Sequence, residues 1–588
     1  MTGFVSSLST IWRLAIPYFR SDDCWPGRIL LAAVIGTELS LVGIAVLLNI
    51  WYNQFYNALQ ERNWDAFVTQ LLYFGVLAAA ATVLQVYQLY LNQWLQIRWR
   101  RWMTKRYLAH WLEGATHYRM QLLGDAADNP DQRVADDIRM FIERTLTIGV
   151  GLLSAIVTLA SFMVILWKLS AAAPFDMFGV TIAIPGYLVW AALIYAILGT
   201  TLTHLIGWPL VTLNFNQQRY EADFRFNLVR VRENSEQIAL LAGETAETER
   251  LLTRFGHVVA NWHRIMLRQK RLTFFTTAYT RFAIVFPFIV VSPAYFAGLM
   301  QLGGLVQTAG AFNSVETALS FFITIYRDLA EWRAVIARLD GFDRSITAAR
   351  AVAVAPPQAD AISPATKPGL SIAGLSVRLP TGAPLVATED LFIEAGQRAL
   401  VTGPSGCGKS TLFRAIAGVW PFGAGTVLVP RGAKLMMLPQ RPYFPIASLE
   451  AAVSYPSELG VYTPERIAEA INAVGLPVLA RRLSEEAHWN RILSLGEQQR
   501  LAIARAILQA PDYLFLDEAT ASLDEPSEAR LYRLLLERLP RATIVSIGHR
   551  STLFAFHDRH LTLHPEGDHH RIRDAVLGPA VTAKLADS

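Results

Sequence analysis

The chain has 588 residues, of which 53% are hydrophobic and only 17% are charged. An average soluble domain carries about 25% charged residues, so this composition excludes an ordinary soluble protein and indicates a membrane protein of more than one domain. The net charge of +5 is small, and the basic residues flank apolar stretches, which argues against a nucleic-acid-binding protein.

The first half of the chain contains six apolar stretches, each close to the ~20 residues that cross a bilayer as a helix. An interfacial helix over 8–28, which mixes aromatic and basic residues, is predicted before them. The predicted spans cover 29–51, 67–95, 146–168, 181–206, 274–300 and 306–328. The sixth is the weakest, because Asn313, Glu316 and Thr317 interrupt it.

Basic residues predict the orientation of these spans. The connections between the second and third spans and between the fourth and fifth are rich in arginine, whereas the connection between the fifth and sixth has no Lys or Arg. Because basic connections stay in the cytoplasm, both long connections and both termini are expected there. Two stretches of these connections, 128–133 and 230–238, are either solvated helix faces or surfaces that dock on the second half.

Polar side chains occur inside the predicted spans. Gln85, Gln88 and Asn92 share one helix face of the second span. Glu38 lies in the first span and Glu316 in the sixth. Polar groups are costly against lipid, so these side chains should face inward, either as hydrogen bonds between helices or as the lining of a water-filled cavity. A carboxylate without a partner is especially costly, which favours the cavity for the two glutamates.

Residues 347–368 are rich in Ala, Val and Pro and predict a linker. The chain then divides into a helical membrane domain over 1–346 and a second domain over 369–588. In the second domain, short β-type runs alternate with helical ones, which predicts an α/β fold.

A glycine-rich loop lies between an apolar run and a helical one at the start of this second domain. Its residues are Gly403, Pro404, Ser405, Gly406, Cys407, Gly408, Lys409, Ser410 and Thr411. The strand, loop and helix N-terminus match a P-loop, in which backbone N–H groups surround phosphate oxygens. Lys409 would reach the β- and γ-phosphates of a nucleotide, and the Ser410 hydroxyl would ligate Mg²⁺.

A buried parallel strand over 513–517 predicts a second part of the site. It delivers Asp517 and Glu518 at its C-terminal end, where ligands bind in such sheets. Asp517 would hold Mg²⁺, and Glu518 would polarise the attacking water.

Three further segments contain candidate residues of a phosphate-binding site. Gln440 ends an apolar run, and His549 ends a strand over 544–547. In the run Leu-Ser-Leu-Gly-Glu-Gln-Gln-Arg over 493–500, Ser494 is placed at a helix N-cap with free backbone N–H groups, which makes a second phosphate-binding surface.

In this order, the motifs resemble the nucleotide-binding domain of ABC transporters over about 370–563. The resemblance implies a Q-loop at Gln440, a D-loop over 521–524 and a switch histidine, His549, that senses the γ-phosphate. It implies a signature that includes Ser494, Gly496 and Gln498, and it makes Gln440 a further Mg²⁺ ligand. In this family each ATP lies between one P-loop and the partner domain's signature, so a chain with one of each implies a homodimer or a heterodimer with a similar half-transporter.

The chain departs from the family at the adenine-stacking position before the P-loop. The family often has an aromatic residue there, and this chain has Leu379. Base–aromatic stacking is worth ~1–3 kcal/mol in other contexts, so weak discrimination between bases is expected.

The membrane half resembles the BacA/SbmA-related bacterial transporters with a fused ATPase, a group related to peroxisomal fatty-acyl transporters. The resemblance rests on the runs 129–133 and 232–239 and on the Trp-Arg-Ala sequence over 332–334. It implies an exporter-type fold that is nevertheless associated with uptake of hydrophilic compounds such as cobalamin, bleomycin and antimicrobial peptides.

The sequence thus predicts an ATP-driven transporter of a small hydrophilic cargo, with ATP and Mg²⁺ as cofactors. It is expected to work as a homodimer in a bacterial cytoplasmic membrane. An exporter of lipid or fatty acyl-CoA is the alternative. A nucleotide-gated channel or regulatory membrane protein is the alternative of another class, which the complete set of hydrolytic residues disfavours.

Overall fold

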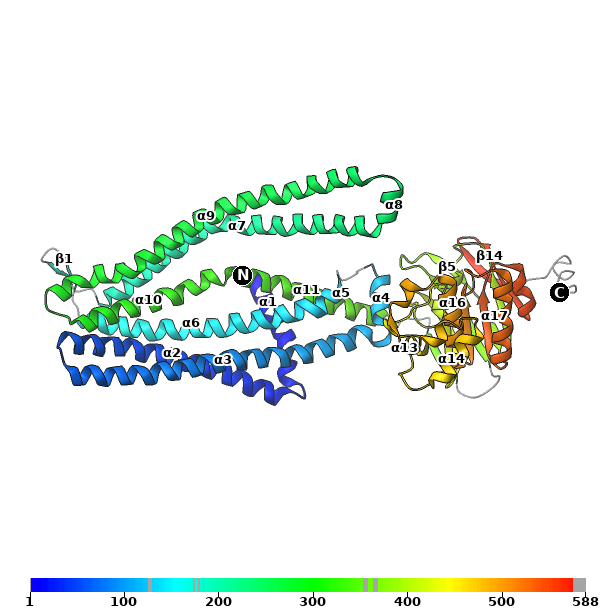
Figure 1. Ribbon diagram of the computed structural model, residues 1–588, viewed down its shortest axis with the longest axis horizontal. Coiled ribbons are helices and arrows are strands. Elements are labelled where there is room, and N and C mark those ends of the chain that lie inside the picture. Colours follow the sequence, from blue (N-terminus) through cyan, green and yellow to red (C-terminus); the bar gives the residue numbers. More distant parts are fainter. Residues whose placement is uncertain are drawn as a thin grey trace. The chain divides into compact units, whose positions relative to one another are not determined.

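The computed structural model describes residues 2–124, 129–172, 175–177, 180–182, 185–352, 358–362 and 369–574. It divides into two compact units. The first comprises Met1–Leu108 and Asn129–Phe342, and the second comprises Ala109–Asp128 and Asp343–Ser588. Figure 1 shows that the first is built of long helices and that the second contains the sheet.

The long helices of the first unit form where the sequence is apolar over many consecutive residues. Among the described residues, five helices are long and apolar enough to cross a membrane. They are α2 (Cys24–Gln60), α3 (Trp64–Leu112), α6 (Ile138–Ala172), α7 (Tyr187–Glu233) and α9 (Glu244–Phe296). Each includes most of one predicted span, and α3, α7 and α9 extend well beyond it.

The sixth predicted span corresponds to α10 (Leu302–Thr324). This segment is helical, but it is not among the five helices that meet the length and hydropathy criteria for a span. Its polar residues explain this, since Asn313, Glu316 and Thr317 lower its hydropathy. The sixth crossing therefore stays a prediction.

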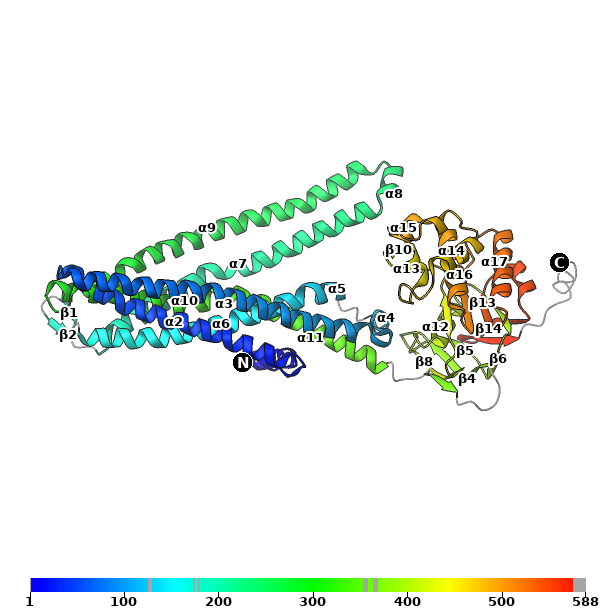
Figure 2. The ribbon, with the colours of Figure 1, turned by 60° about the horizontal axis from the view of Figure 1, so that its bottom comes forward.

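The packing of the first unit has two main features, the paired helices α7 and α9 and the central position of α10 among four helices. Helices α7 and α9 run side by side in both views and are joined by the short α8 (Ser235–Leu240) (Figures 1 and 2). Helix α10 packs against α2, α6, α7 and α9, and buried Phe162, Val291 and Phe312 belong to the core between them. The stretch predicted as one interfacial helix over 8–28 is divided among α1 (Thr2–Ala15), a short 3₁₀ turn, Tyr18–Arg20, and the start of α2, and its interfacial position stays a prediction.

The second unit is built on an 11-stranded sheet with the order β3-β8-β4-β5-β15-β14-β7-β13-β12-β9, with β6 paired to β4. The strands are β3 (Gln358–Ile362), β4 (Gly369–Arg378), β5 (Pro384–Ala387), β6 (Leu391–Glu394), β7 (Arg398–Thr402), β8 (Gly423–Pro430), β9 (Leu435–Leu438), β12 (Tyr513–Asp517), β13 (Thr543–Ile547), β14 (Arg559–Glu566) and β15 (His569–Asp574). Strands β14, β7, β13, β12 and β9 run parallel. Strands β12 and β13 are buried along their whole length, as expected of a parallel sheet with helices on its faces.

The helices of the second unit include α12 (Lys409–Ile416), α16 (Leu495–Gln509) and α17 (Glu525–Arg538) (Figure 2). A short helix from the first half of the sequence, α4 (Thr116–Leu122), also belongs to it.

The predicted linker over 347–368 contains regular structure where it is described. Helix α11 (Tyr326–Val352) continues to Val352, and β3 pairs with β8 in the sheet. Ala favours helices, which suits the end of α11, whereas β3 (Gln-Ala-Asp-Ala-Ile) has a sequence of low strand propensity and is formed through its pairing with β8. Residues 353–357 and 363–368 lie outside the described residues.

Candidate functional site

The P-loop connects β7 to the N-terminus of α12, as predicted. Gly406 and Gly408 have φ angles of +78° and +96°, which favour glycine. A Cβ atom on Gly408 would also lie only 2.7 Å from Val386 Cγ2. The ammonium of Lys409 donates hydrogen bonds of 2.8 Å to the carbonyl oxygens of Gly403 and Pro404, so its charge lies directly over the loop.

Two of the three predicted metal ligands, Ser410 and Asp517, are adjacent, whereas the third, Gln440, donates its amide to Glu518. The Ser410 hydroxyl donates to Asp517 Oδ1 at 2.8 Å, although the residues are far apart in sequence. Burial raises the pKa of the Asp517 carboxyl, and the hydrogen bond from Ser410 opposes that shift. A hydroxyl and a carboxylate are hard oxygen donors of the kind that Mg²⁺ prefers, so this pair fits the ion.

Glu518 lies between the two other predicted catalytic residues. Gln440 Nε2 donates to Glu518 Oε2 at 3.1 Å, and His549 Nε2 lies 3.2 Å from Glu518 Oε1. The backbone of Glu518 has φ +49°, a left-handed conformation that costs a non-glycine residue about 1 kcal/mol. Such strain persists where neighbouring contacts hold it, and it often marks functional sites.

The signature segment begins helix α16 as predicted. Ser494 is the N-cap and forms a capping box with Glu497, in which each side chain accepts a hydrogen bond from the other's backbone N–H. Ser494 is exposed, whereas Gln498 is buried with 7% of its surface accessible. The carboxamide of Gln498 donates to the Leu493 carbonyl at 2.8 Å, so this side chain fixes the loop before α16 and does not reach the surface.

Two contacts of the D-loop had no signal in the sequence pattern. Gln499 in α16 accepts a hydrogen bond from the Ser522 N–H, and Arg550 donates to two D-loop carbonyl groups. A glutamine in the middle of a helix and an arginine after a strand are common, and only the tertiary structure shows that both face one loop.

The sequence pattern also gave no sign of a contact within the second unit. Leu122 of α4 packs against one of the core clusters, and Arg119 Nη2 donates to the Gly418 carbonyl at 3.5 Å. The two stretches suggested for docking lie elsewhere: 129–133 and 230–238 belong to the first unit, and residue 128 lies outside the described residues. Their docking stays a prediction.

The polar residues of the membrane helices differ in the contacts that they make. Gln88 donates to the carboxylate of Glu38, which joins α3 to α2. Asn92 accepts from Gln96 on the same helix, and Gln85 is exposed. Glu316 accepts from Ser320 at 3.0 Å on its own helix.

A further row of amides joins α2 to α10. Asn53 Nδ2 donates to Gln307 Oε1 at 2.7 Å, and the Gly303 N–H donates to Asn57 Oδ1 at 2.8 Å. The two helices approach closely there, because a Cβ on Gly303 would lie 2.0 Å from the Asn53 carbonyl oxygen. Part of the polar content of the spans therefore serves as hydrogen bonds between helices.

Comparison with known proteins assigns both halves of the chain. Residues 13–296 match the family described as ABC transporter transmembrane region 2, and residues 388–521 match the family described as ABC transporter. The chain is 34% identical to the inner membrane ABC transporter ATP-binding protein YddA of Escherichia coli (strain K12), over 91% of this chain and 93% of that protein. It is 32% identical to ABC transporter D family member 2, chloroplastic, of Arabidopsis thaliana, over 95% of this chain and 87% of that protein.

Two more distant similarities complete the comparison. The lysosomal cobalamin transporter ABCD4 of Homo sapiens is 25% identical, over 87% of each chain. A bacterial Atm1-family ABC exporter with ATP bound has the same fold, with a TM-score of 0.70, 17% identity and coverage of 95% of this chain and 96% of that chain. The chain therefore belongs to the ABC transporters, as a half-transporter related to the D family that couples ATP hydrolysis in its second domain to transport by its membrane region.

Proposed function

We propose that this transporter moves a small hydrophilic compound, of cobalamin-, bleomycin- or peptide-like chemistry, into a bacterial cell as a homodimer in the cytoplasmic membrane. One observation supports the proposed hydrolysis of ATP by this site: Gln440 and His549 contact the two carboxylate oxygens of Glu518. This arrangement suits a carboxylate that orients an attacking water and takes up its proton.

Each remaining residue of the site has a role in this proposal. The backbone of the P-loop and Lys409 bind the phosphates of ATP, and Ser410 and Asp517 hold Mg²⁺. When bound, the ion neutralises charge on the β- and γ-phosphate oxygens. His549 keeps Glu518 in place and senses the γ-phosphate.

A second copy completes the site. The chain has one P-loop and one signature, and Ser494 is exposed at the N-terminus of α16. The first-turn N–H groups that the capping box does not use, those of Leu495 and Gly496, would be offered to a nucleotide held by the partner's P-loop. ATP binding would close the pair of domains, and the membrane helices would follow that motion.

The cargo proposal rests on polar side chains in the membrane helices. Asn313 and Thr317 are exposed on α10, and Glu316 between them is half-buried, so this helix presents polar groups where lipid would be unfavourable. A polar surface of this kind suits a hydrophilic compound better than an acyl chain. The relative named as a lysosomal cobalamin transporter supports the same class of cargo.

The test uses the full-length protein in liposomes of known sidedness. ATPase activity and movement of labelled cobalamin are measured together, with Glu518→Gln as the hydrolysis control and Lys409→Ala as the nucleotide-binding control. The expected result is ATP-dependent cobalamin movement that both variants lose, with Glu518→Gln still binding ATP and Lys409→Ala binding it weakly.

Other outcomes discriminate between the alternatives. ATPase activity stimulated by acyl-CoA or lipid, without cobalamin movement, would support an exporter of lipid-like cargo. Ion conduction gated by ATP without net hydrolysis would support a channel. Normal ATPase turnover in Glu518→Gln would refute the role proposed for this carboxylate.

A further inference from the structure

An ion pair with a buried carboxylate connects the segment after His549 with the segment after the D-loop. Glu528, in the first turn of α17, is only 2% exposed, and its Oε2 atom lies 3.5 Å from Arg550 Nη1. The Thr520 hydroxyl donates to Glu528 Oε1 at 2.6 Å, and the Thr552 hydroxyl donates to Oε2 at 3.4 Å. A buried carboxylate is tolerated where an opposite charge and hydrogen-bond donors replace water, and these three residues supply both.

The guanidinium of Arg550 also holds the D-loop. Its Nη1 donates to the Leu523 carbonyl at 2.5 Å, and its Nη2 donates to the Ala521 carbonyl at 3.2 Å. The planar fork of an arginine can serve two carbonyl groups and a carboxylate together, which a lysine ammonium cannot do in the same geometry. Arg550 directly follows His549 in the sequence and thus fixes the D-loop backbone to the segment that carries this histidine.

Gln499 holds the same loop from another side. It is completely buried, its Oε1 accepts from the Ser522 N–H at 3.0 Å, and its Nε2 donates to the Gln440 carbonyl at 3.0 Å. One side chain therefore links the D-loop to the residue whose amide contacts Glu518. The D-loop, Gln440 and His549 are connected into one network around Glu518.

We propose that Arg550 and Gln499, with Glu528 as the counter-ion of Arg550, are positioning residues for ATP hydrolysis. They act through Gln440, His549 and the D-loop and not on the reacting atoms. Their network fixes the two groups that contact Glu518 relative to each other. This inference rests on the proposed roles of Glu518 and His549.

The test measures kcat and KM for ATP, together with ATP affinity, in the full-length transporter. Arg550→Lys keeps a positive charge but loses the forked donation, and Glu528→Gln keeps the shape but removes the counter-ion. In each variant kcat should fall about tenfold, since hydrogen bonds from a charged group are lost at a site that must be preorganised. KM and ATP affinity should change less than about twofold, because the P-loop contacts are untouched.

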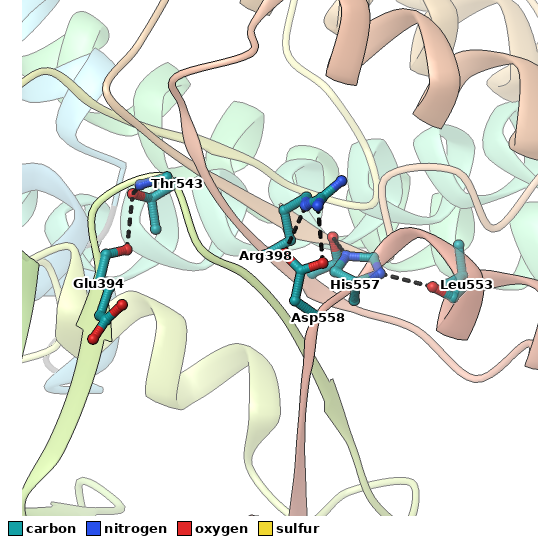
Figure 3. Close-up of polar contacts among 8 residues, drawn as sticks. Glu394, Arg398, Thr543, Leu553, His557 and Asp558 are labelled. Atoms are coloured by element: carbon teal, nitrogen blue, oxygen red, sulfur yellow. Dashed lines mark hydrogen bonds and ion pairs between the residues drawn. The ribbon is translucent and has the colours of Figure 1, made fainter. Parts of the chain in front are cut away.

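Arg398 offers a matched control. Its guanidinium donates two hydrogen bonds of 2.8 Å to the carboxylate of Asp558 (Figure 3). This arginine is the first residue of β7, at the opposite end of that strand from the P-loop, and Arg398→Gln should leave kcat unchanged. Because the side chain of Arg550 is one-third exposed, Arg550→Lys should fold even if Glu528→Gln does not, and the thermal unfolding transition of each variant checks this.

The double variant gives an independent readout. The single variant Arg550→Gln is measured for this purpose as well. If Arg550 and Glu528 act as a pair, Arg550→Gln combined with Glu528→Gln should lose less activity than the product of the losses in Arg550→Gln and Glu528→Gln alone. Wild-type kcat in both Arg550→Lys and Glu528→Gln, with Glu518→Gln inactive, would overturn the positioning role. An equal loss in Arg398→Gln would overturn it too, whereas full turnover in Glu518→Gln would refute the proposed function instead.

Discussion

The carboxylate of Asp137 accepts two hydrogen bonds from the guanidinium of Arg338, from Nε to Oδ2 at 2.9 Å and from Nη2 to Oδ1 at 2.6 Å. Asp137 is completely buried and also pairs with Arg133 at 2.6 Å. The contact joins the segment that leads into α6 to helix α11. A second contact joins α6 itself to α11, since the Trp332 indole N–H donates to the Thr145 hydroxyl at 2.9 Å.

Asp137→Asn should destabilise the protein, because it leaves two arginine side chains facing a neutral amide. Removing one partner of a buried ion pair costs about 3 kcal/mol or more. The measurement is the thermal unfolding transition in detergent. Asp136→Asn is the matched control, since Asp136 is half-exposed and its nearest Arg139 nitrogen lies 3.8 Å away. Equal transitions for the two variants would show that the Asp137 contacts do not stabilise the fold.

Gly303→Ala should separate α2 from α10. Its methyl group would meet the Asn53 carbonyl oxygen at 2.0 Å, and a backbone atom cannot move aside as a flexible side chain does. The folded yield and the unfolding temperature should both fall. Gly43→Ala serves as the control, because nothing lies within 4 Å of its Cβ position. Unchanged stability in Gly303→Ala would mean that the close approach of these helices is not needed.

Local sequence patterns anticipated the parts of the site that local chemistry determines. The strand before the P-loop, the strand ending at Asp517 and the N-cap at Ser494 are all present. Each depends on a few neighbouring residues, so an apolar run or a capping residue is enough to indicate it.

Contacts between distant segments could not be predicted from local sequence patterns. Asn53 and Gln307 are 254 positions apart, and their hydrogen bond leaves no periodic signal in either helix. The same holds for Arg550 and the D-loop. Hydropathy indicates only the part of a helix that crosses lipid, and the charged connections that continue α7 and α9 beyond the predicted spans are helical too.

His557 should make the stability of the second unit depend on pH. Burial lowers the pKa of His557 to about 4 from its ordinary value near 6.5. Its ring nitrogens contact the Leu553 carbonyl (Figure 3) and the Ser546 hydroxyl, both at 2.8 Å. The unfolded chain therefore takes up a proton before the folded one does. The stabilisation is complete above pH 6.5 and falls by about 3 kcal/mol as the pH drops to 4.

The check is the unfolding transition of the full chain between these pH values, compared with that of His557→Gln. The variant should be less stable at neutral pH and show a flatter pH dependence. His564→Gln, the same change at an exposed position, should keep the wild-type slope. A wild-type slope in His557→Gln would assign the pH dependence to other groups.

Leu379 should leave the transporter with weak discrimination between nucleotide bases. It follows β4 directly and is 37% exposed, and an aliphatic side chain there cannot stack on adenine as an aromatic ring does. Wild-type protein should hydrolyse ATP and GTP with kcat/KM values within a few fold of each other. Leu379→Tyr should raise ATP affinity about tenfold, in line with ~1–3 kcal/mol for base stacking, while Leu379→Met should leave it unchanged. A strong preference of the wild type for ATP would mean that another residue contacts the base.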